Sequence, residues 1–323
     1  MKRISALFPL LLLVTIGSLP ARAQGDGPLP PITATNAAQV RQVARLGNGT
    51  YYKTAWSSDG KTIAVGGSAG VWLYDAANMD EAPRLLEGYA DSVIRGTLDN
   101  TNVTSVVFSA DGTLVAAGSY DRTARVWDVK TGQALAVFRA TGGVDSVALS
   151  SDGMLLASGD ESGMVQLWNV KTGQVTASWS ANLADRGRGP LTGMAFSPDG
   201  SLLVTADTND VVQLWNIKSG QPTPLMNGGY GAPTSVAFSP DGSQVASANG
   251  YAGSVQLWDV KSGQLTTTLM RDLDINSLAF SPDGSILAAS DGTSIRLVDV
   301  KSGQITATLK GHPDEVSSVA FSP

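Results

Sequence analysis

Few residues in this chain have the types and spacing that catalysis requires. It contains one histidine, His312, and no cysteine. A thiolate nucleophile, a Cys-ligated metal and a disulfide framework are therefore excluded, and a zinc site or a Ser/His triad would depend on a single residue. Carboxylates are plentiful, but six of them stand in regularly spaced Asp-Gly pairs, which indicates turn formers rather than paired acids. They are Asp59, Asp111, Asp152, Asp199, Asp241 and Asp283.

Other short motifs point to no cofactor. The glycine pairs Gly66-Gly67 and Gly228-Gly229 precede no predicted helix, so a phosphate cradle is not expected. No loop resembles the calcium-binding loop of an EF-hand. We therefore expect no catalytic residue, no cofactor and no metal site, and a protein that is not an enzyme.

The composition indicates a globular protein, whose secondary-structure elements would position any functional site. Of its 323 residues, 42% are apolar and 15% are charged, which excludes a disordered or fibrous protein. A chain of this length buries a sizeable core without a disulfide or metal.

The first residues have the pattern of a secretory signal peptide. Lys2 and Arg3 precede an apolar run, and Ala21-Arg22-Ala23 is a small-x-small cleavage site. We expect residues 1–23 to be removed and residues 24–37 to be a linker. The remaining chain would carry a net charge of about −9, which opposes binding to nucleic acid or to an anionic membrane. The prediction is a secreted or periplasmic protein, of bacterial type since cysteine is absent, without stable membrane insertion after cleavage.

A sequence pattern recurs about every 41 residues. A second marker, typified by FSPDG from Phe196, keeps step with it in six copies, and Phe321-Ser322-Pro323 begins a seventh. A fixed period of this length predicts a repeat architecture. The copies of the first pattern are VWDVKTGQ from Val126, LWNVKTGQ from Leu167, LWNIKSGQ from Leu214, LWDVKSGQ from Leu257 and LVDVKSGQ from Leu297, with a divergent one from Leu73.

These residues resemble the tryptophan-aspartate (WD) repeat family over nearly all of residues 38–323. The resemblance implies an all-β fold, a β-propeller whose four-stranded antiparallel blades carry strands a to d from the centre outward. Each unit has room for four short strands but not for a crossover helix. The small residues of strand b, such as those in LVAAGS, predict close approach of neighbouring blades.

The strand count predicts six complete blades and an incomplete seventh. Residues 39–46 look like the outer strand of a seventh blade, and residues 316–321 look like its inner strand. Strands b and c of that blade are missing, which suggests a fragment of a longer reading frame. The alternative is a ring of six blades, which leaves both of these strands without partners.

This chain departs from the WD-repeat pattern at a set of four buried residues, the tetrad, that the family uses to stabilise each blade. The resemblance implies a hydrogen-bond chain of a histidine, a strand-b Ser or Thr, a turn Asp and the strand-c Trp. Only Gly311-His312 keeps the Gly-His pair, and only Asp121 keeps the turn Asp. We interpret His312 as a structural residue of the unfinished blade rather than a catalytic one. Apolar packing between blades must then supply more of the stability.

Binding residues are expected where the repeats lose their regularity. The extra length lies in two d–a connections, within residues 88–102 and 180–190. In the family the d–a and b–c loops open on one narrow face. In this chain tyrosines and arginines concentrate in these loops, and both residue types contribute much of the binding energy at interfaces. The candidate partner-binding residues are Tyr89, Arg95, Tyr120, Arg122, Arg186, Arg188, Tyr230, Tyr251 and Arg271.

The sequence therefore predicts a non-enzymatic exported scaffold that binds a protein or peptide through this face or through the mouth of the central channel. Two alternatives stay open. One is a propeller-type enzyme such as a glycosidase, a lyase or a quinone-dependent dehydrogenase. The other is a repeat module of a larger surface or sensor protein.

Overall fold

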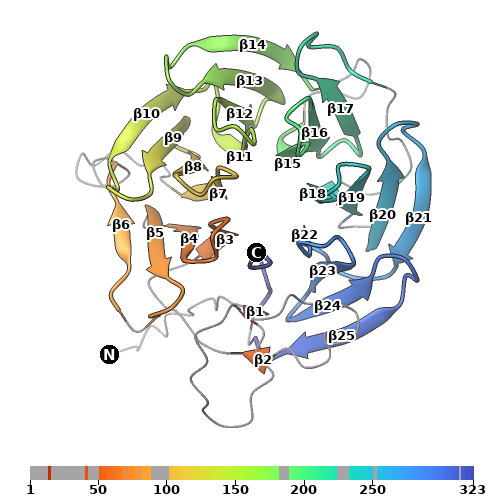
Figure 1. The fold of residues 1–323 in the computed structure, drawn as a ribbon. Helices are drawn as coiled ribbons and strands as arrows, with labels where there is room; N and C mark the ends of the chain where they lie inside the picture. Colours follow the sequence, from red (N-terminus) through yellow and green to blue (C-terminus); the bar gives the residue numbers. More distant parts are fainter. Residues whose placement is uncertain are drawn as a thin grey trace, which may run out of the picture.

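The fold is a ring of antiparallel β-sheets around a central channel (Figure 1). This computed structural model describes residues 51–68, 70–79, 81–88, 102–181, 189–223, 233–249, 253–312 and 314–323, with two short strands near the N-terminus. Every regular element in these residues is a β-strand, which confirms the predicted all-β propeller. None of the described segments is a helix that could cross a membrane.

The first three blades follow one another along the chain, each with four strands in sequence order. Blade 1 holds β3 (Tyr51–Trp56), β4 (Thr62–Gly67), β5 (Gly70–Asp75) and β6 (Arg84–Leu86). Blade 2 holds β7 (Val103–Phe108), β8 (Leu114–Ser119), β9 (Thr123–Asp128) and β10 (Ala134–Arg139). Blade 3 holds β11 (Val144–Leu149), β12 (Leu155–Asp160), β13 (Met164–Asn169) and β14 (Val175–Ser180).

The next three blades continue the ring. Blade 4 holds β15 (Leu191–Phe196), β16 (Leu202–Asp207) and β17 (Val212–Asn216). Blade 5 holds β18 (Pro233–Phe238), β19 (Gln244–Asn249), β20 (Ser254–Asp259) and β21 (Leu265–Met270). Blade 6 holds β22 (Leu278–Phe280), β23 (Ile286–Asp291), β24 (Ser294–Asp299) and β25 (Ile305–Lys310).

The fourth position of blade 4 differs from the others. There a single bridge joins Trp215 to Pro222 instead of a regular strand. Proline has no backbone N–H to donate to the ladder, and the sequence places prolines at both 222 and 224. The blade therefore keeps its three inner strands and only a trace of the outer one within the described residues.

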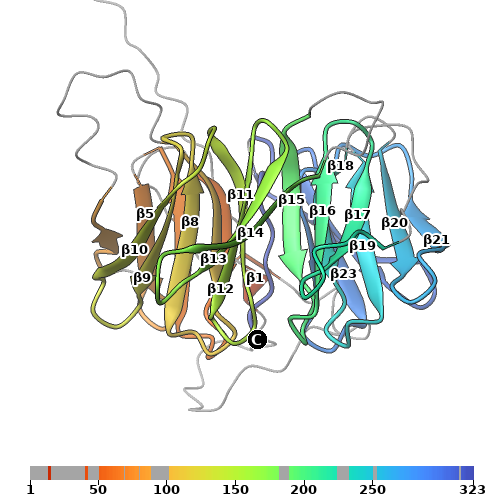
Figure 2. The same cartoon turned by 90° about the horizontal axis from the view of Figure 1, so that it is seen from above.

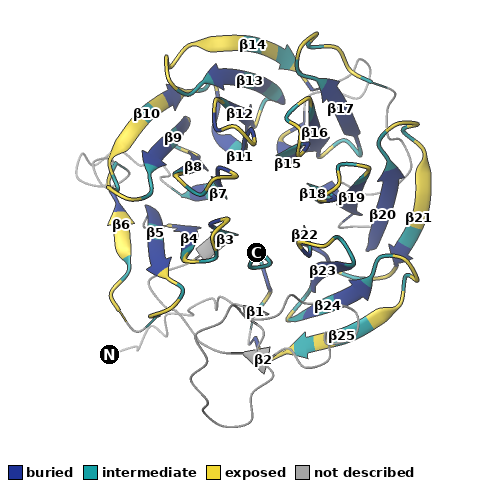
Figure 3. Cartoon of the chain, in the orientation of Figure 1, coloured by how far each residue is buried: buried dark blue, intermediate teal, exposed yellow. Residues whose placement is uncertain are grey.

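Burial follows the radial order of the strands. The strands run roughly along the ring axis (Figure 2), and the outermost ones are exposed along much of their length (Figure 3). The apolar clusters lie between blades: Val71 and Leu73 of blade 1, for example, share a cluster with Val103, Val106 and Trp127 of blade 2. Each blade is therefore stabilised chiefly by its neighbours.

Small residues in strand b allow this close packing, as predicted. A Cβ atom placed on Gly66 would lie 2.5 Å from Val103 Cγ1, and one placed on Gly118 would lie 2.6 Å from Val144 Cγ1. In both cases the valine belongs to the next blade. The missing side chain is thus the space that the neighbouring strand a fills.

The Asp-Gly pairs form the tight turns between strands a and b. In blade 2, Ser109 Oγ donates to Asp111 Oδ1 at 2.6 Å and the backbone N–H of Thr113 donates to the same oxygen at 3.0 Å. Gly112 has a φ of 71°, a left-handed conformation that favours glycine. These hydrogen bonds, the serine's first, lower the pKa of Asp111. The prediction that these aspartates are turn formers is confirmed.

Part of the buried tetrad persists in three blades. The indole N–H of Trp168 donates to Ser158 Oγ at 2.8 Å, and Trp215 and Trp258 make the same bond to Thr205 and Ser247 at 2.9 Å. In blade 2 the strand-b position holds alanine, and Trp127 donates instead to the carbonyl of Glu87 at 2.9 Å. His312, at the end of blade 6, is 7% exposed.

The C-terminal residues lie between blades 6 and 1 (Figure 1). Residues 314–323 form no regular strand, but Val316 and Val319 pack against Ile286, Ile295 and Leu297 of blade 6. The backbone N–H of Val319 also donates to Ser277 Oγ at 3.1 Å. This segment therefore lies at the inner rim between blades 6 and 1, where the sequence predicts the inner strand of a seventh blade. No strand is assigned to residues 316–321, so the seventh blade stays a prediction.

The N-terminal predictions fall largely outside the described residues. Of the strand expected at 39–46, the structure describes β2 (Arg41–Gln42), which pairs antiparallel with β1 (Val14–Thr15). The rest of the expected signal peptide, the expected linker at 24–37 and the rest of the expected outer strand lie outside that description. These assignments stay predictions.

Candidate functional site: the mouth of the central channel

In blades 2 to 5 a β-bulge near the start of strand a positions one side chain on the central channel. The register shifts across the second residue of β7, β11, β15 and β18, which are Thr104, Asp145, Thr192 and Thr234. A bulge turns a side chain away from the regular alternation of a strand. All four of these residues line one cavity, together with Asn276 and Ser317 at the equivalent repeat positions. The channel therefore has a ring of polar side chains.

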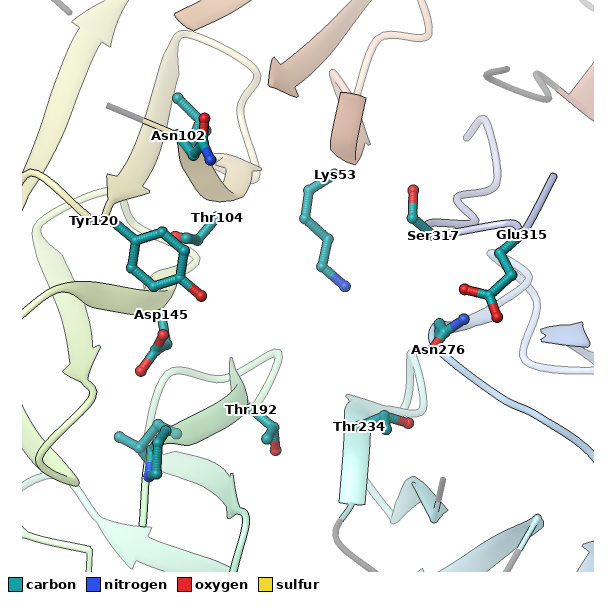
Figure 4. A pocket seen from close by; sticks show the side chains of 13 residues that line it. Lys53, Asn102, Thr104, Tyr120, Asp145, Thr192, Thr234, Asn276, Glu315 and Ser317 are labelled. Carbon is teal, nitrogen blue, oxygen red and sulfur yellow. The ribbon is translucent and has the colours of Figure 1, made fainter. Parts of the chain in front are cut away.

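This cavity has a volume of about 550 Å³ and opens where the d–a and b–c connections lie. Figure 4 shows side chains from several blades converging on it. One amine and two carboxylates are among its walls. The lining residues with charged or large polar side chains are Lys53, Asn102, Tyr120, Asp145, Asn276 and Glu315.

Lys53 reaches into the channel from β3 (Figure 4). Burial lowers the pKa of its amine, because the charged form loses water. The ion pairs found among the described residues are Lys61–Asp59, Arg125–Asp121 and Arg296–Asp291, so Lys53 takes part in none of them. The channel thus holds a half-buried amine with no protein carboxylate within 4.0 Å in that part of the chain.

Asp145 faces the same cavity from β11. Burial, together with the nearby carboxylates of Glu161 and Asp160, raises the pKa of Asp145 to about 7. Its Oδ2 atom is buried and has no hydrogen-bond partner within the described residues. Asp145 therefore lines the channel with a carboxyl group whose pKa is close to neutral and whose buried oxygen is unsatisfied.

Asp160, close by, is a contrasting case. Burial alone would raise the pKa of Asp160, but hydrogen bonds from Ser162, Thr141 and the backbone outweigh it and hold the pKa below its ordinary value. Ser162 Oγ donates to Asp160 Oδ1 at 2.6 Å, and Thr141 Oγ1 donates to Oδ2 at 2.5 Å. Asp160 is thus a fixed negative charge that braces two loops, and its field acts on Asp145.

Three of the nine predicted partner-binding residues lie within the described residues. Tyr120 lines the channel mouth and is 43% exposed. Arg122, with a φ of 67°, and Arg271 are exposed but do not line the cavity. The structure therefore brings Tyr120 into the channel site and leaves both arginines away from it. Outside the described residues lie Tyr89, Arg95, Arg186, Arg188, Tyr230 and Tyr251.

Sequence reasoning missed the charged residues of the channel. Lys53, Asp145 and Glu315 lie in or beside strand a, which carries no extra length and no unusual composition. The available signal was departure from the repeat: Lys53 stands where five other repeats have serine and one has glycine, and Asp145 stands where Thr104 and Thr192 occur. Comparing the repeats position by position would have revealed both.

The described residues include no group of three or more His, Asp or Glu side chains that could hold a metal ion. With a lysine, a tyrosine, two carboxylates and several amides and hydroxyls around an open hollow, the arrangement suits hydrogen bonding and ion pairing to a bound chain.

Comparison with known families agrees with this architecture. The family described as nucleolar protein 10-like, N-terminal domain, a β-propeller, matches residues 135–302. The WD domain, G-beta repeat, matches residues 92–128 and 303–323. The comparison with curated proteins gave no match.

Proposed function

The chain belongs to the nucleolar protein 10-like β-propeller family and carries WD repeats, and on this basis we propose that it is a non-enzymatic scaffold that binds a protein or peptide at the mouth of its central channel. WD-repeat propellers typically mediate protein–protein interactions, which is compatible with this role. The face concerned is the one with the d–a and b–c connections.

The observation that carries the proposal is the channel cavity of about 550 Å³ with its polar ring. Its volume is in the range of ligand pockets, which is about 300–1,000 Å³. Its walls combine an exposed tyrosine with amides and charged groups, the residue types that orient a bound chain. The opposite face carries repeated short turns whose aspartates are occupied by their own serines, as for Ser239 and Asp241 at 2.6 Å.

The test is selection of peptides from a phage-displayed library on the immobilised full chain. We expect enriched peptides whose binding weakens when Tyr120 is replaced by alanine. The matched control is Lys130→Ala in the c–d turn of blade 2, an exposed residue on the opposite side, which should leave binding unchanged. If Lys130→Ala abolishes binding and Tyr120→Ala does not, the face has been assigned wrongly. If no peptide is enriched, the scaffold proposal is contradicted.

We also propose that the protein is exported and that its mature form begins at Gln24. The support is the basic start, the apolar run and the Ala21-Arg22-Ala23 site. N-terminal sequencing of protein from its native host should find Gln24 outside the cytoplasm. Recovery of intact Met1 from the cytosol would contradict export.

A further inference from the structure

Two charged residues of the channel depart from the repeat. In the other repeats the position of Lys53 holds Ser105, Ser146, Gly193, Ser235, Ser277 and Ser318. Four of these serines, Ser105, Ser235, Ser277 and Ser318, accept a hydrogen bond from a backbone N–H of the next blade at 3.1–3.2 Å. Lysine has no oxygen with which to make this bond, so the fold does not explain its presence in blade 1.

Asp145 departs in the same way. Two of its counterparts, Thr104 and Thr234, donate their hydroxyls to carbonyls of the neighbouring blade, Val144 and Ile275. The pKa of Asp145 is about 7, so its carboxyl group cannot donate once it has ionised above that pH, and its Oδ2 atom has no hydrogen-bond partner in the described structure. Equivalent positions have the same structural role in every blade, so a charged side chain that occurs in one blade alone is not required for folding.

Neither charge is neutralised by the other. Both side chains line the cavity and extend from different walls of it (Figure 4), but they form no ion pair within 4.0 Å. Burying a charge without a partner is unfavourable. Thr192 Oγ1, in the same cavity, is also buried without a hydrogen bond in that part of the chain. Two ionisable side chains that line one hollow without an ion-pair partner, Lys53 and Asp145, suggest that a ligand pairs with them.

The surroundings determine the sign of the charge that each wall favours. Glu161 and Asp160 reinforce the negative potential at Asp145. On the other side Lys53 is the one cationic residue among the described residues that line the cavity, where Glu315 adds a second carboxylate. A purely acidic ligand would meet repulsion from two carboxylates, and a purely basic one would leave Lys53 unpaired.

We propose that the channel binds a peptide segment that carries both charges, an acidic side chain paired with Lys53 and a basic side chain paired with Asp145. This inference rests on the proposed function and names the chemistry of its peptide. The amides of Asn102 and Asn276 at the same mouth are suited to the peptide's backbone groups.

The test repeats the library selection on the wild-type chain and on Lys53→Met, Asp145→Asn and the control Lys130→Met. Peptides enriched on the wild type should contain an acidic and a basic residue close together. Lys53→Met should lose the enrichment of Asp and Glu, and Asp145→Asn should lose that of Lys and Arg. The control should select the same peptides as the wild type.

Calorimetric titration with one synthetic enriched peptide then separates pairing from general damage. Changing the peptide's Glu to Gln should weaken binding to the wild type on the order of tenfold or more, but should change little on Lys53→Met. Changing its Lys to Gln should behave likewise with Asp145→Asn. Lys53→Arg and Asp145→Glu, which keep the charges, should retain the preference.

The outcomes distinguish the two proposals. If peptides are enriched and need Tyr120, but carry no such charge pair or lose the same affinity in every variant, the paired-charge inference is wrong and the scaffold proposal stands. If no peptide is enriched on any form of the chain, both fail.

Discussion

Ser318 Oγ accepts a hydrogen bond from the backbone N–H of Thr54 at 3.1 Å, across 264 residues of sequence. The same bond joins Ser105 to Val147, Ser235 to Leu278 and Ser277 to Val319, always between corresponding repeat positions of neighbouring units. A second contact between neighbouring units also recurs at the C-terminus: Pro323 lies beside Gly60, as Pro198 lies beside Gly242. The C-terminal segment therefore closes the ring between blades 6 and 1.

This closure predicts the effect of removing the serine. Ser318→Ala should lower the free energy of unfolding by about 1–3 kcal/mol, because the N–H of Thr54 loses its acceptor. Ser105→Ala and Ser235→Ala should have similar effects. Urea denaturation checks this, with Ser58→Ala as a control, since Ser58 is exposed and makes no such bond. A neutral Ser318→Ala beside destabilising Ser105→Ala and Ser235→Ala would show that the seventh position does not close the ring.

The Trp168–Ser158 pair gives a second prediction. Ser158→Ala leaves the buried indole N–H without its acceptor and should cost about 1–3 kcal/mol in urea denaturation. Trp168→Phe removes the donor as well, so Ser158→Ala should cost clearly less in a Trp168→Phe background. Equal costs in the two backgrounds would mean that the hydrogen bond contributes nothing to stability.

Asp145 should make stability depend on pH. Its pKa in the folded chain, about 7, lies above the ordinary value, so the folded state binds this proton more tightly than the unfolded state. The resulting stabilisation is fully present below about pH 4 and is lost as the pH rises through about 7. Asp145→Asn, which cannot ionise, should therefore gain stability relative to the wild type between pH 4 and pH 8.

The expected gain is about 1–2 kcal/mol, because solvent screens a partly exposed carboxyl. Urea denaturation at several pH values measures it. The control is Asp241→Asn, since the hydrogen bond from Ser239 and others lower the pKa of Asp241 and keep it charged in this range. A constant difference between Asp145→Asn and the wild type from pH 4 to pH 8 would contradict the assignment.

The tyrosines of the predicted face can be ranked by substitution. Tyr120→Ala should weaken binding of a selected peptide by at least about 2 kcal/mol, roughly 30-fold, if Tyr120 is a dominant contact. Its exposure of 43% suggests a small change in folding stability. Tyr89→Ala, Tyr230→Ala and Tyr251→Ala, measured by the same titration, test the remaining predicted tyrosines. If all four variants bind the peptide as tightly as the wild type does, none of these tyrosines contributes to binding.

Local rules were sufficient for much of this fold. The period of about 41 residues, the Asp-Gly turns and the small residues of strand b each express a short-range demand: a fixed unit length, a positive φ at Gly112, or the absence of a side chain at Gly66. Such demands can be recognised from neighbouring residues, so the all-β propeller and the turn role of Asp111 were predictable. The position of Tyr120 on the face with the d–a and b–c connections was predictable for the same reason, since its b–c turn could be placed within the repeat.

The channel site depended on contacts between blades. Lys53, Asp145 and Glu315 are far apart in sequence. They line one cavity because the ring brings the starts of β3 and β11 and the C-terminal segment to the same axis. The raised pKa of Asp145 comes from burial and from carboxylates on other segments. The sequence by itself determined the repeat and its turns, whereas the tertiary structure alone decided which charges share the channel, because burial and electrostatic coupling are properties of the assembled ring.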